Sequence, residues 1–365
     1  MRAGMQSLLT LLRGEPISDI PLLEWMTVLD LAEQEYILPW TAACLNAADP
    51  WSPQLAERLH GIRRSAQFSA FLWTSTLKET LAEFHRRSIP VISLKGPWLA
   101  ERLCGDASLR NYADLDLLVR RSDISPAEGL LSGLGFLPAG RRDDYQRPWR
   151  RGGITIELHH DVENPLAFDF RVAEAWQRAQ SAEFHGVPAR LLAPDDERLF
   201  LCLHGVRHRF ERLSHILDLV FAFRSWPGSP TPSPFNPAAD NLLALGTRMA
   251  VRLDPRLAVA DPASLNLRDR ESLDTLAAQL WQERVRAPAP PLDWRAKHQF
   301  FLALETRPRS RALTRFRHLR ILLTRLIDAD FAFAARFRLR RRWQVWLLRP
   351  IRLLFKGDRA SPLPG

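Results

Sequence analysis

The spacing of hydrophobic and polar positions changes along the chain and divides it into four parts. Residues 1–88 place apolar side chains at helical intervals, which predicts an N-terminal helical region. Residues 89–195 contain short, β-branched runs bounded by Pro and Gly, which predict a small α/β sheet domain. Helical spacing returns over residues 196–306 and predicts a helical domain, and residues 307–365 form an arginine-rich amphipathic tail.

Strands and helices alternate in the sheet domain. We expect strands at residues 90–95, 114–120, 154–159 and near 189–192, and helices at residues 96–103 and 125–134. This order, with few short strands, is typical of an α+β fold in which a small mixed sheet is flanked by N-terminal and C-terminal helical regions. Proline-rich segments at residues 227–237 and 287–291 predict connections without regular structure.

The net charge is concentrated in the tail. The whole chain carries +10, whereas residues 301–365 contain 16 Lys and Arg against 4 Asp and Glu. The remaining residues hold 35 basic against 37 acidic side chains and are close to neutral. A basic segment that mixes Arg with Phe and Trp suits an anionic membrane surface or, less well, RNA, and equally a helix packed on the rest of the protein.

The cysteines and the lengths of the apolar runs indicate a reducing compartment. Cys44, Cys104 and Cys202 are far apart and odd in number, which fits neither a disulfide framework nor a zinc site. The first residues hold no signal peptide of normal length, and no stretch of about 18 uninterrupted apolar residues predicts a membrane span. We expect a cytoplasmic protein, with peripheral contact of the tail at the membrane as a further possibility.

Two carboxylates share one face of the second expected strand. In Asp114-Leu-Asp116, strand alternation places both aspartates on the same side, about 6.6 Å apart along the backbone. Carboxylates placed in this way repel each other unless cations lie between them. They suit magnesium or manganese together with substrate phosphates, and two such ions about 3.5–4 Å apart support phosphoryl chemistry. An Asp-x-Asp pair alone also arises by chance at strand ends.

The third expected strand supplies another acid. In Ile154–His159, alternation places Glu157 and His159 on the polar face and the apolar residues on the other face. A glutamate in the middle of a strand is poorly placed unless it has a role. We predict that Asp114, Asp116 and Glu157 are metal ligands and catalytic residues, and that His159 assists proton transfer.

The turn after the first expected strand suits phosphate. Lys95-Gly96 lies where a strand leads into a helix, whose free N–H groups favour phosphate. Gly96 allows a close approach of phosphate to the backbone, and Lys95, one of only 4 lysines among 51 basic residues, adds charge. Arg110 either binds phosphate or pairs with one of the aspartates. The plain alternative for Lys95 is a surface lysine beside a glycine that starts a helix.

These residues together resemble a known family. Leu94-Lys-Gly96, Leu109-Arg110, Asp114-Leu-Asp-Leu-Leu-Val119 and Ile156-Glu-Leu-His159 are similar to the bacterial uncharacterised nucleotidyltransferase family of the DNA polymerase β-like superfamily. The resemblance covers residues 88–225 and extends to Leu201–His208, Arg212-Leu213 and Asp218. It implies a nucleotidyltransferase-like domain and a metal-dependent transfer of NMP from an NTP, with Asp114, Asp116 and Glu157 as the three acids. Lys95-Gly96 stands where the wider superfamily has Gly-Ser or Gly-Gly.

Two histidines extend the expected site. His204 and His208 are four residues apart on an expected helix and therefore share a face. The zinc-protease interpretation is excluded, since Gly205 follows the first histidine where those enzymes have Glu. A hydrogen-bonded structural pair is the alternative to a role near phosphate. The nucleotide-binding set that we expect is Lys95, Gly96, Arg110 and His208.

Three functions fit these patterns. The first is a nucleotidyltransferase that uses an NTP and a protein side chain, a small-molecule hydroxyl or an RNA end as acceptor. The second is a glycosyltransferase, whose Asp-x-Asp pair also binds a metal and a nucleotide diphosphate but usually needs a larger sheet domain. The third is a nucleotidyltransferase-like module that binds a partner without turnover.

Overall fold

The computed structural model contains many helices and one mixed sheet. The described residues are 2–15, 17, 20–45, 51–140, 145–163, 168, 170–228, 237–262, 265, 267–286, 302, 304, 312, 315, 316, 319, 328–337, 339 and 341–354. The chain forms two compact units, Met1–Pro165 with Asp169–Thr306, and Leu166–Phe168 with Arg307–Gly365. Of the expected proline-rich connections at residues 227–237 and 287–291, residues 229–236 and all of the second lie outside the described residues, as does most of the segment 305–327.

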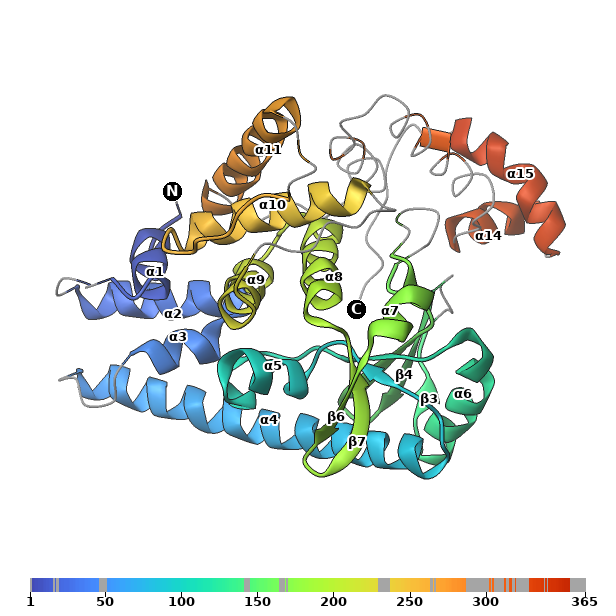
Figure 1. The fold of residues 1–365 in the computed structure, drawn as a ribbon, viewed down its shortest axis with the longest axis horizontal. Helices are drawn as coiled ribbons and strands as arrows, with labels where there is room; N and C mark the ends of the chain where they lie inside the picture. Colours follow the sequence, from blue (N-terminus) through green and yellow to red (C-terminus); the bar gives the residue numbers. More distant parts are fainter. Residues whose placement is uncertain are drawn as a thin grey trace. The chain divides into compact units, whose positions relative to one another are not determined.

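The helical regions expected on both sides of the sheet are present (Figure 1). The helices of the first unit are α1 (Met5–Leu12), α2 (Leu22–Gln34), α3 (Leu38–Cys44), α4 (Pro53–Arg86), α5 (Pro97–Cys104), α6 (Ile124–Gly133), α7 (Val172–Arg178), α8 (Pro194–Arg207), α9 (Leu213–Ser225), α10 (Pro237–Leu253) and α11 (Leu267–Arg286), with 3-10 turns η1 (Ala107–Leu109) and η2 (Arg121–Asp123). The strands are β1 (Ile92–Ser93), β2 (Leu115–Leu118), β3 (Leu137–Pro138), β4 (Gln146–Arg151), β5 (Ile154–His159), β6 (Gln180–Phe184) and β7 (Val187–Leu191).

The seven strands form one mixed sheet in the order β3-β4-β5-β2-β1-β7-β6. β2 pairs with β1 in the antiparallel sense and with β5 in the parallel sense. Along the β2–β5 pair, Asp116 is opposite Glu157 and Leu117 is opposite Leu158. Residues that are partners across two strands point to the same face of a sheet, so this register places acids beside acids and leucines beside leucines.

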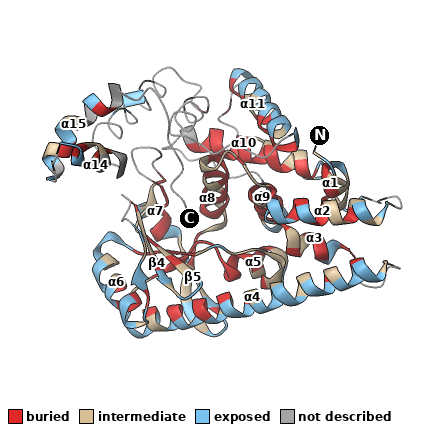
Figure 2. Ribbon diagram, turned by 180° about the vertical axis from the view of Figure 1, so that it is seen from behind, coloured by how far each residue is buried: buried red, intermediate tan, exposed pale blue. Residues whose placement is uncertain are grey.

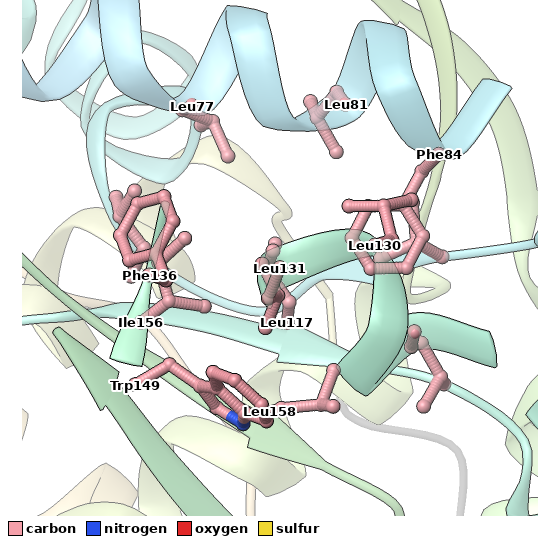
Figure 3. Packing of buried hydrophobic residues seen from close by; sticks show 14 of the residues in the cluster. Leu77, Leu81, Phe84, Leu117, Leu130, Leu131, Phe136, Trp149, Ile156 and Leu158 are labelled. Atoms are coloured by element: carbon pink, nitrogen blue, oxygen red, sulfur yellow. The ribbon is translucent and has the colours of Figure 1, made fainter. Parts of the chain in front are cut away.

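One face of the sheet is covered by α4 and α6. α4 starts at Pro53, and the side chain of Ser52 caps it by accepting from the Leu55 N–H at 3.4 Å. Its inward face is buried and its outward face is exposed, as Figure 2 shows. The buried α4 residues Leu77, Leu81 and Phe84 point at the leucines of β2 and β5, so this face holds the hydrophobic core (Figure 3).

The core is large enough to fix the register of the two central strands. Leu117, Ile156 and Leu158 are each at most 3% exposed, and Trp149 of β4 and Phe136 pack on them. Full burial of one such side chain stabilises the fold by about 1.5–3 kcal/mol. A slip by one residue would turn these leucines out of the core, so the acidic positions stay on the opposite face.

The other face of the sheet lies toward α8 and α9 (Figure 1). α8 begins with Pro194 at its first turn and with Asp195, Asp196 and Glu197 there, where acids favour the positive end of the helix. α8, α9 and α10 pack on one another, and most of α9 is buried. α8 and α9 therefore cover the polar face of β2 and β5.

Three strands were not expected from the sequence, namely the two-residue β3 and the longer β4 and β6. β4 reads Gln-Arg-Pro-Trp-Arg-Arg and β6 reads Gln-Ser-Ala-Glu-Phe, and neither alternates between apolar and polar positions. β4 forms because it pairs along its full length with β5, and β6 because it forms a hairpin with β7. All four expected strands are present, as β1, β2, β5 and β7.

The second unit contains α14 (Asp328–Ala335) and α15 (Arg342–Leu354). The two helices pack together, and Arg352 of α15 donates to Asp330 of α14 at 2.5 Å. Among the described residues, no helix is both long and apolar enough to cross a membrane.

Candidate active site

Two of the three expected acids meet on the polar face of the sheet. Asp116 and Glu157 are register partners, and ligand atoms of Asp116, Glu157 and His159 all lie within 4.8 Å of one another. Asp114 precedes β2 by one residue and lines the same cavity. The parallel pairing of β2 with β5 thus gathers carboxylates that are about forty positions apart in the chain.

His159 holds one oxygen of the central aspartate. Its Nε2 lies 2.9 Å from Asp116 Oδ1 and 3.5 Å from Glu157 Oε2. Burial alone would lower the pKa of His159, but hydrogen bonds to the two carboxylates raise it to about 9. A protonated His159 donates to Asp116 and fixes the orientation of that carboxylate.

The other oxygen of Asp116 accepts no hydrogen bond from any residue that the structure describes. Asp116 Oδ2 is buried, and the Nζ of Lys95 lies 3.5 Å from it. Burial alone would raise the pKa of Asp116, but Lys95 and the His159 hydrogen bond hold it well below its usual range. A buried carboxylate oxygen without a hydrogen bond is a position that a cation can occupy.

Burial and neighbouring negative charge both disfavour the ionised form of Asp114. Burial and then the charge of Asp116 raise the pKa of Asp114 from 3.8 to about 7. A divalent cation between these carboxylates would remove that repulsion. The donor set of three carboxylates is the hard oxygen chemistry that magnesium and manganese prefer, so these residues fit such an ion.

Lys95 follows β1 and is buried, which excludes the surface lysine that the sequence left open. Its Nζ lies 2.8 Å from His204 Nδ1, and burial lowers the pKa of its ammonium group. Gly96 has φ 86° and ψ −159°, a conformation available essentially to glycine only, and caps the start of α5. A Cβ at Gly96 would lie 3.0 Å from Leu115 Cδ2.

Arg110 pairs with a residue that the sequence did not link to it. Its Nε and Nη2 donate to Asp218 of α9 at 3.0 and 2.8 Å, so the pairing partner is neither Asp114 nor Asp116. Burial alone would lower the pKa of Arg110, but the paired Asp218 outweighs burial and raises that pKa above its ordinary value. A two-point pair of this kind fixes the guanidinium in one orientation beside the cavity.

Three histidines gather on α8 and α9. The ring centroids of His204, His208 and His215 lie 4.8 to 5.2 Å apart. Burial, followed by nearby positive charge, lowers the pKa of His204 and His215 well below the usual value, so both rings are neutral. His208 Nδ1 lies 3.3 Å from Glu211 Oε1.

These side chains line one cavity of about 350 Å³. Its walls come from β2 and β5 on one side and from α8 and α9 on the other, and all expected site residues except Gly96 and His159 line it. Arg207 at the end of α8 also lines it and donates to Tyr145 Oη at 3.2 Å. The volume is at the small end of ordinary ligand pockets, which run from about 300 to 1,000 Å³.

Sequence reasoning missed Tyr145 and His215. Tyr145 stands just before β4, a strand that has no apolar alternation, so nothing placed it beside the acids. His215 stands at the start of α9, seven residues after His208 and on a different helix. A count of histidines between 204 and 215 was the one available signal, and it carries no spatial information.

Comparison with solved structures gives two distant likenesses. The chain is similar to the crystal structure of ANT(2")-Ia in complex with adenylyl-2"-tobramycin, at 18% identity over 49% of this chain and 97% of that one, with a TM-score of 0.36. It is also similar to an antigenic nucleotidyltransferase-like protein from Paracoccidioides brasiliensis, at 17% identity over 51% of this chain and 89% of that one, with a TM-score of 0.36. No curated protein matches the chain.

The family comparison covers more of the chain. Residues 21–229, more than half of the sequence, match the family described as "Uncharacterised nucleotidyltransferase". The matched region contains the whole sheet, the three acids, the Lys95-Gly96 turn and the histidines of α8 and α9. The chain therefore belongs to the uncharacterised nucleotidyltransferase family.

Proposed function

We propose that this protein catalyses the metal-dependent transfer of a nucleoside monophosphate from an NTP to a hydroxyl group of a protein or small-molecule acceptor. The observation that carries the proposal is that buried Asp116 and half-buried Asp114 and Glu157 line one cavity, and that Asp116 Oδ2 accepts no hydrogen bond from the described residues. Buried carboxylates this close are stable only with positive charge beside them. Membership of the family supports the same chemistry.

The three acids would hold magnesium or manganese. Divalent cations at these carboxylates would orient the attacking oxygen and neutralise the leaving pyrophosphate. His159 fixes the orientation of Asp116 through its Nε2 hydrogen bond, and we assign it this positioning role in preference to proton transfer. Glu157 is half-buried and would complete the set from β5.

The phosphates would lie against the positive side of the cavity. Lys95 lines the cavity and supplies a charge, and Gly96 caps the start of α5, where the positive end of the helix would favour phosphate. Arg110 would reach phosphate with its Nη1, since its Nε and Nη2 are engaged by Asp218. His208 lines the same cavity and would contact the nucleotide or the acceptor.

The proposed location is the cytoplasm, where NTPs are available. The cysteines support this location. Cys44, Cys104 and Cys202 are all free thiols, and burial raises the pKa of Cys104 to about 12. Unreactive, unpaired thiols are ordinary in a reducing compartment. Fractionation of cells that express the full chain tests this location directly.

The decisive experiment compares Mg-ATP binding and pyrophosphate release for wild type and Asp116→Asn. Asparagine keeps the shape and removes the charge, so we expect the variant to fold while its magnesium-dependent ATP binding falls by at least roughly 100-fold. Glu183→Gln is the matched control, because Glu183 is an exposed carboxylate on β6 of the same sheet.

Each outcome has a clear meaning. Equal Mg-ATP binding by wild type and Asp116→Asn would refute the metal site. Preferential binding of UDP- or GDP-sugars over NTPs would favour the glycosyltransferase interpretation. Tight Mg-ATP binding without pyrophosphate release, even when cell extract is supplied as a source of acceptors, would favour a binding module without turnover.

A further inference from the structure

α15 carries four large, exposed apolar side chains. Trp343, Trp346, Leu347 and Ile351 are 59%, 48%, 57% and 43% exposed. Their spacing of three, four and eight residues from Trp343 places them on one side of the helix. Two tryptophans and two aliphatic side chains in one stripe form a larger apolar surface than scattered exposed residues do.

The opposite side of α15 is the one that packs within its own unit. Val345 is fully buried, and Arg352, seven residues further on the same side, is buried and paired with Asp330 of α14. Ala334 of α14 is fully buried as well. The exposed stripe therefore lies away from the face that holds α14 and α15 together, and it can be occupied without opening that contact.

Strong positive charge accompanies this stripe. The segment Arg336-Phe-Arg-Leu-Arg-Arg-Arg342, which leads into α15, contains five arginines in seven residues. Arg336 and Arg341 are exposed. Residues 301–365 together carry 16 basic against 4 acidic side chains, while the rest of the chain is close to neutral. The occupant of this surface must therefore be both anionic and apolar.

We propose that α15 binds in the plane of an anionic lipid bilayer, with the stripe of Trp343, Trp346, Leu347 and Ile351 inserted among the lipids and the arginines at the headgroups. Tryptophan is favoured at the boundary between water and lipid, and arginine binds lipid phosphates. A 13-residue helix is about 20 Å long, too short to span a bilayer but suited to lie on it.

Two other occupants fit the surface less well. RNA would gain from the arginines and from stacking on tryptophan, but Leu347 and Ile351 would gain nothing from it. A second copy of the chain would cover the apolar stripe, but it would bring a second segment of the same high positive charge alongside the first. An anionic membrane provides apolar chains for the stripe and phosphate groups for the arginines.

The test is flotation of the full-length protein with vesicles. With vesicles of phosphatidylcholine and phosphatidylglycerol at low salt, we expect most of the protein to float, and with pure phosphatidylcholine vesicles we expect little binding. The variant Trp343→Ser/Leu347→Ser keeps every charge and should lower the partition into anionic vesicles by roughly tenfold or more, because apolar insertion is lost. Both positions are exposed, so the fold should be unaffected.

The matched control is Phe68→Ser/Phe71→Ser on α4. Phe68 and Phe71 are 65% and 67% exposed and lie three residues apart on a helix of the other unit. This control should float like wild type. Failure of the wild type to bind anionic vesicles overturns the proposal, as does equal binding by Trp343→Ser/Leu347→Ser. Preferential binding of a single-stranded RNA, or a stripe-dependent dimer in sedimentation, overturns it in favour of the other occupant.

Discussion

The Nζ of Lys95 lies 3.5 Å from Asp116 Oδ2, and both side chains are less than a tenth exposed. The ammonium group occupies the side of Asp116 that His159 leaves open. In the absence of a divalent ion, Lys95 is therefore, together with His159, a positive charge that makes a buried Asp116 tolerable. This relationship connects the stability of the fold to the occupancy of the site.

The substitution Lys95→Met should make the stability of the fold depend more strongly on magnesium. We expect the free energy of unfolding without magnesium to fall by on the order of 3 kcal/mol, because Asp116 loses a buried counter-charge. Millimolar magnesium should then raise the melting temperature of the variant more than that of wild type. Thermal and urea unfolding with and without magnesium measure both effects. Lys78→Met, at an exposed lysine of α4, should change neither, and an unaltered Lys95→Met would contradict the assigned role.

Arg110 and Asp218 should show strong energetic coupling. Their side chains are 18% and 9% exposed, and removal of one leaves the other buried without its partner. A double-mutant cycle of Arg110→Ala and Asp218→Ala in urea unfolding should give a coupling above about 2 kcal/mol. The control cycle uses Arg151 and Glu79, an ion pair with side chains 33% and 47% exposed, which should give less than about 1 kcal/mol. Similar coupling in both cycles would disprove the distinction.

Gly96→Ala should destabilise the protein more than Gly105→Ala. Both glycines have positive φ, but only Gly96 has a neighbour in the way, with Leu115 Cδ2 at 3.0 Å from the added Cβ. We expect a loss of about 2–3 kcal/mol at Gly96 and about 1–2 kcal/mol at Gly105, measured by urea unfolding. ATP binding should also weaken in the Gly96 variant alone, since that residue begins the helix proposed to receive phosphate. Equal losses at both positions would count against this account.

Glu197 should make stability depend on pH in an unusual direction. Burial raises its pKa from 4.5 to about 7, although Arg102 Nη1 donates to it at 2.7 Å and opposes the rise. Between these two values the folded chain keeps the proton that the unfolded chain has lost. Raising the pH through this window therefore lowers the free energy of unfolding, by up to about 3 kcal/mol from this group.

Glu197→Gln isolates this contribution. The difference in unfolding free energy, variant minus wild type, should increase from pH 4.5 to pH 7 and level off above it. Urea unfolding across this range measures the difference, and other titrating groups cancel in it. Glu183→Gln, which removes an exposed carboxylate, should give a flat difference. A flat curve for Glu197→Gln would show that its carboxyl group is not protonated in the folded protein.

The parts of the site that alternation encodes were predictable. The expected strand 154–159 coincides with β5, because Ile-Thr-Ile-Glu-Leu-His alternates without interruption. The same alternation in Asp114-Leu-Asp116 put both aspartates on one face of their strand, and the pairing of β2 with β5 places Glu157 beside Asp116. Local spacing is sufficient for such statements, because a strand has a period of two residues whatever surrounds it.

The partners of the charged side chains were not predictable. Arg110 could be placed near the acids but not opposite Asp218, and Lys95 could not be placed against His204, since each pair is more than a hundred positions apart. β4 was missed because its six residues include Pro148 and three arginines, and it is a strand only through its pairing with β5. Long-range contacts decide these features, and no local pattern records them.

The alternation of β2 assigns two tasks to consecutive residues. Leu115 and Leu117 anchor the sheet beneath α4, while Asp116 between them faces the cavity. Loss or gain of a single residue just ahead of this strand would exchange the two sets, driving an acid under the long helix and a leucine into the pocket. The same register of β2 is therefore needed for folding and for the site. A chain with a shifted register should be degraded as unfolded polypeptide and should not persist as an intact but inactive enzyme.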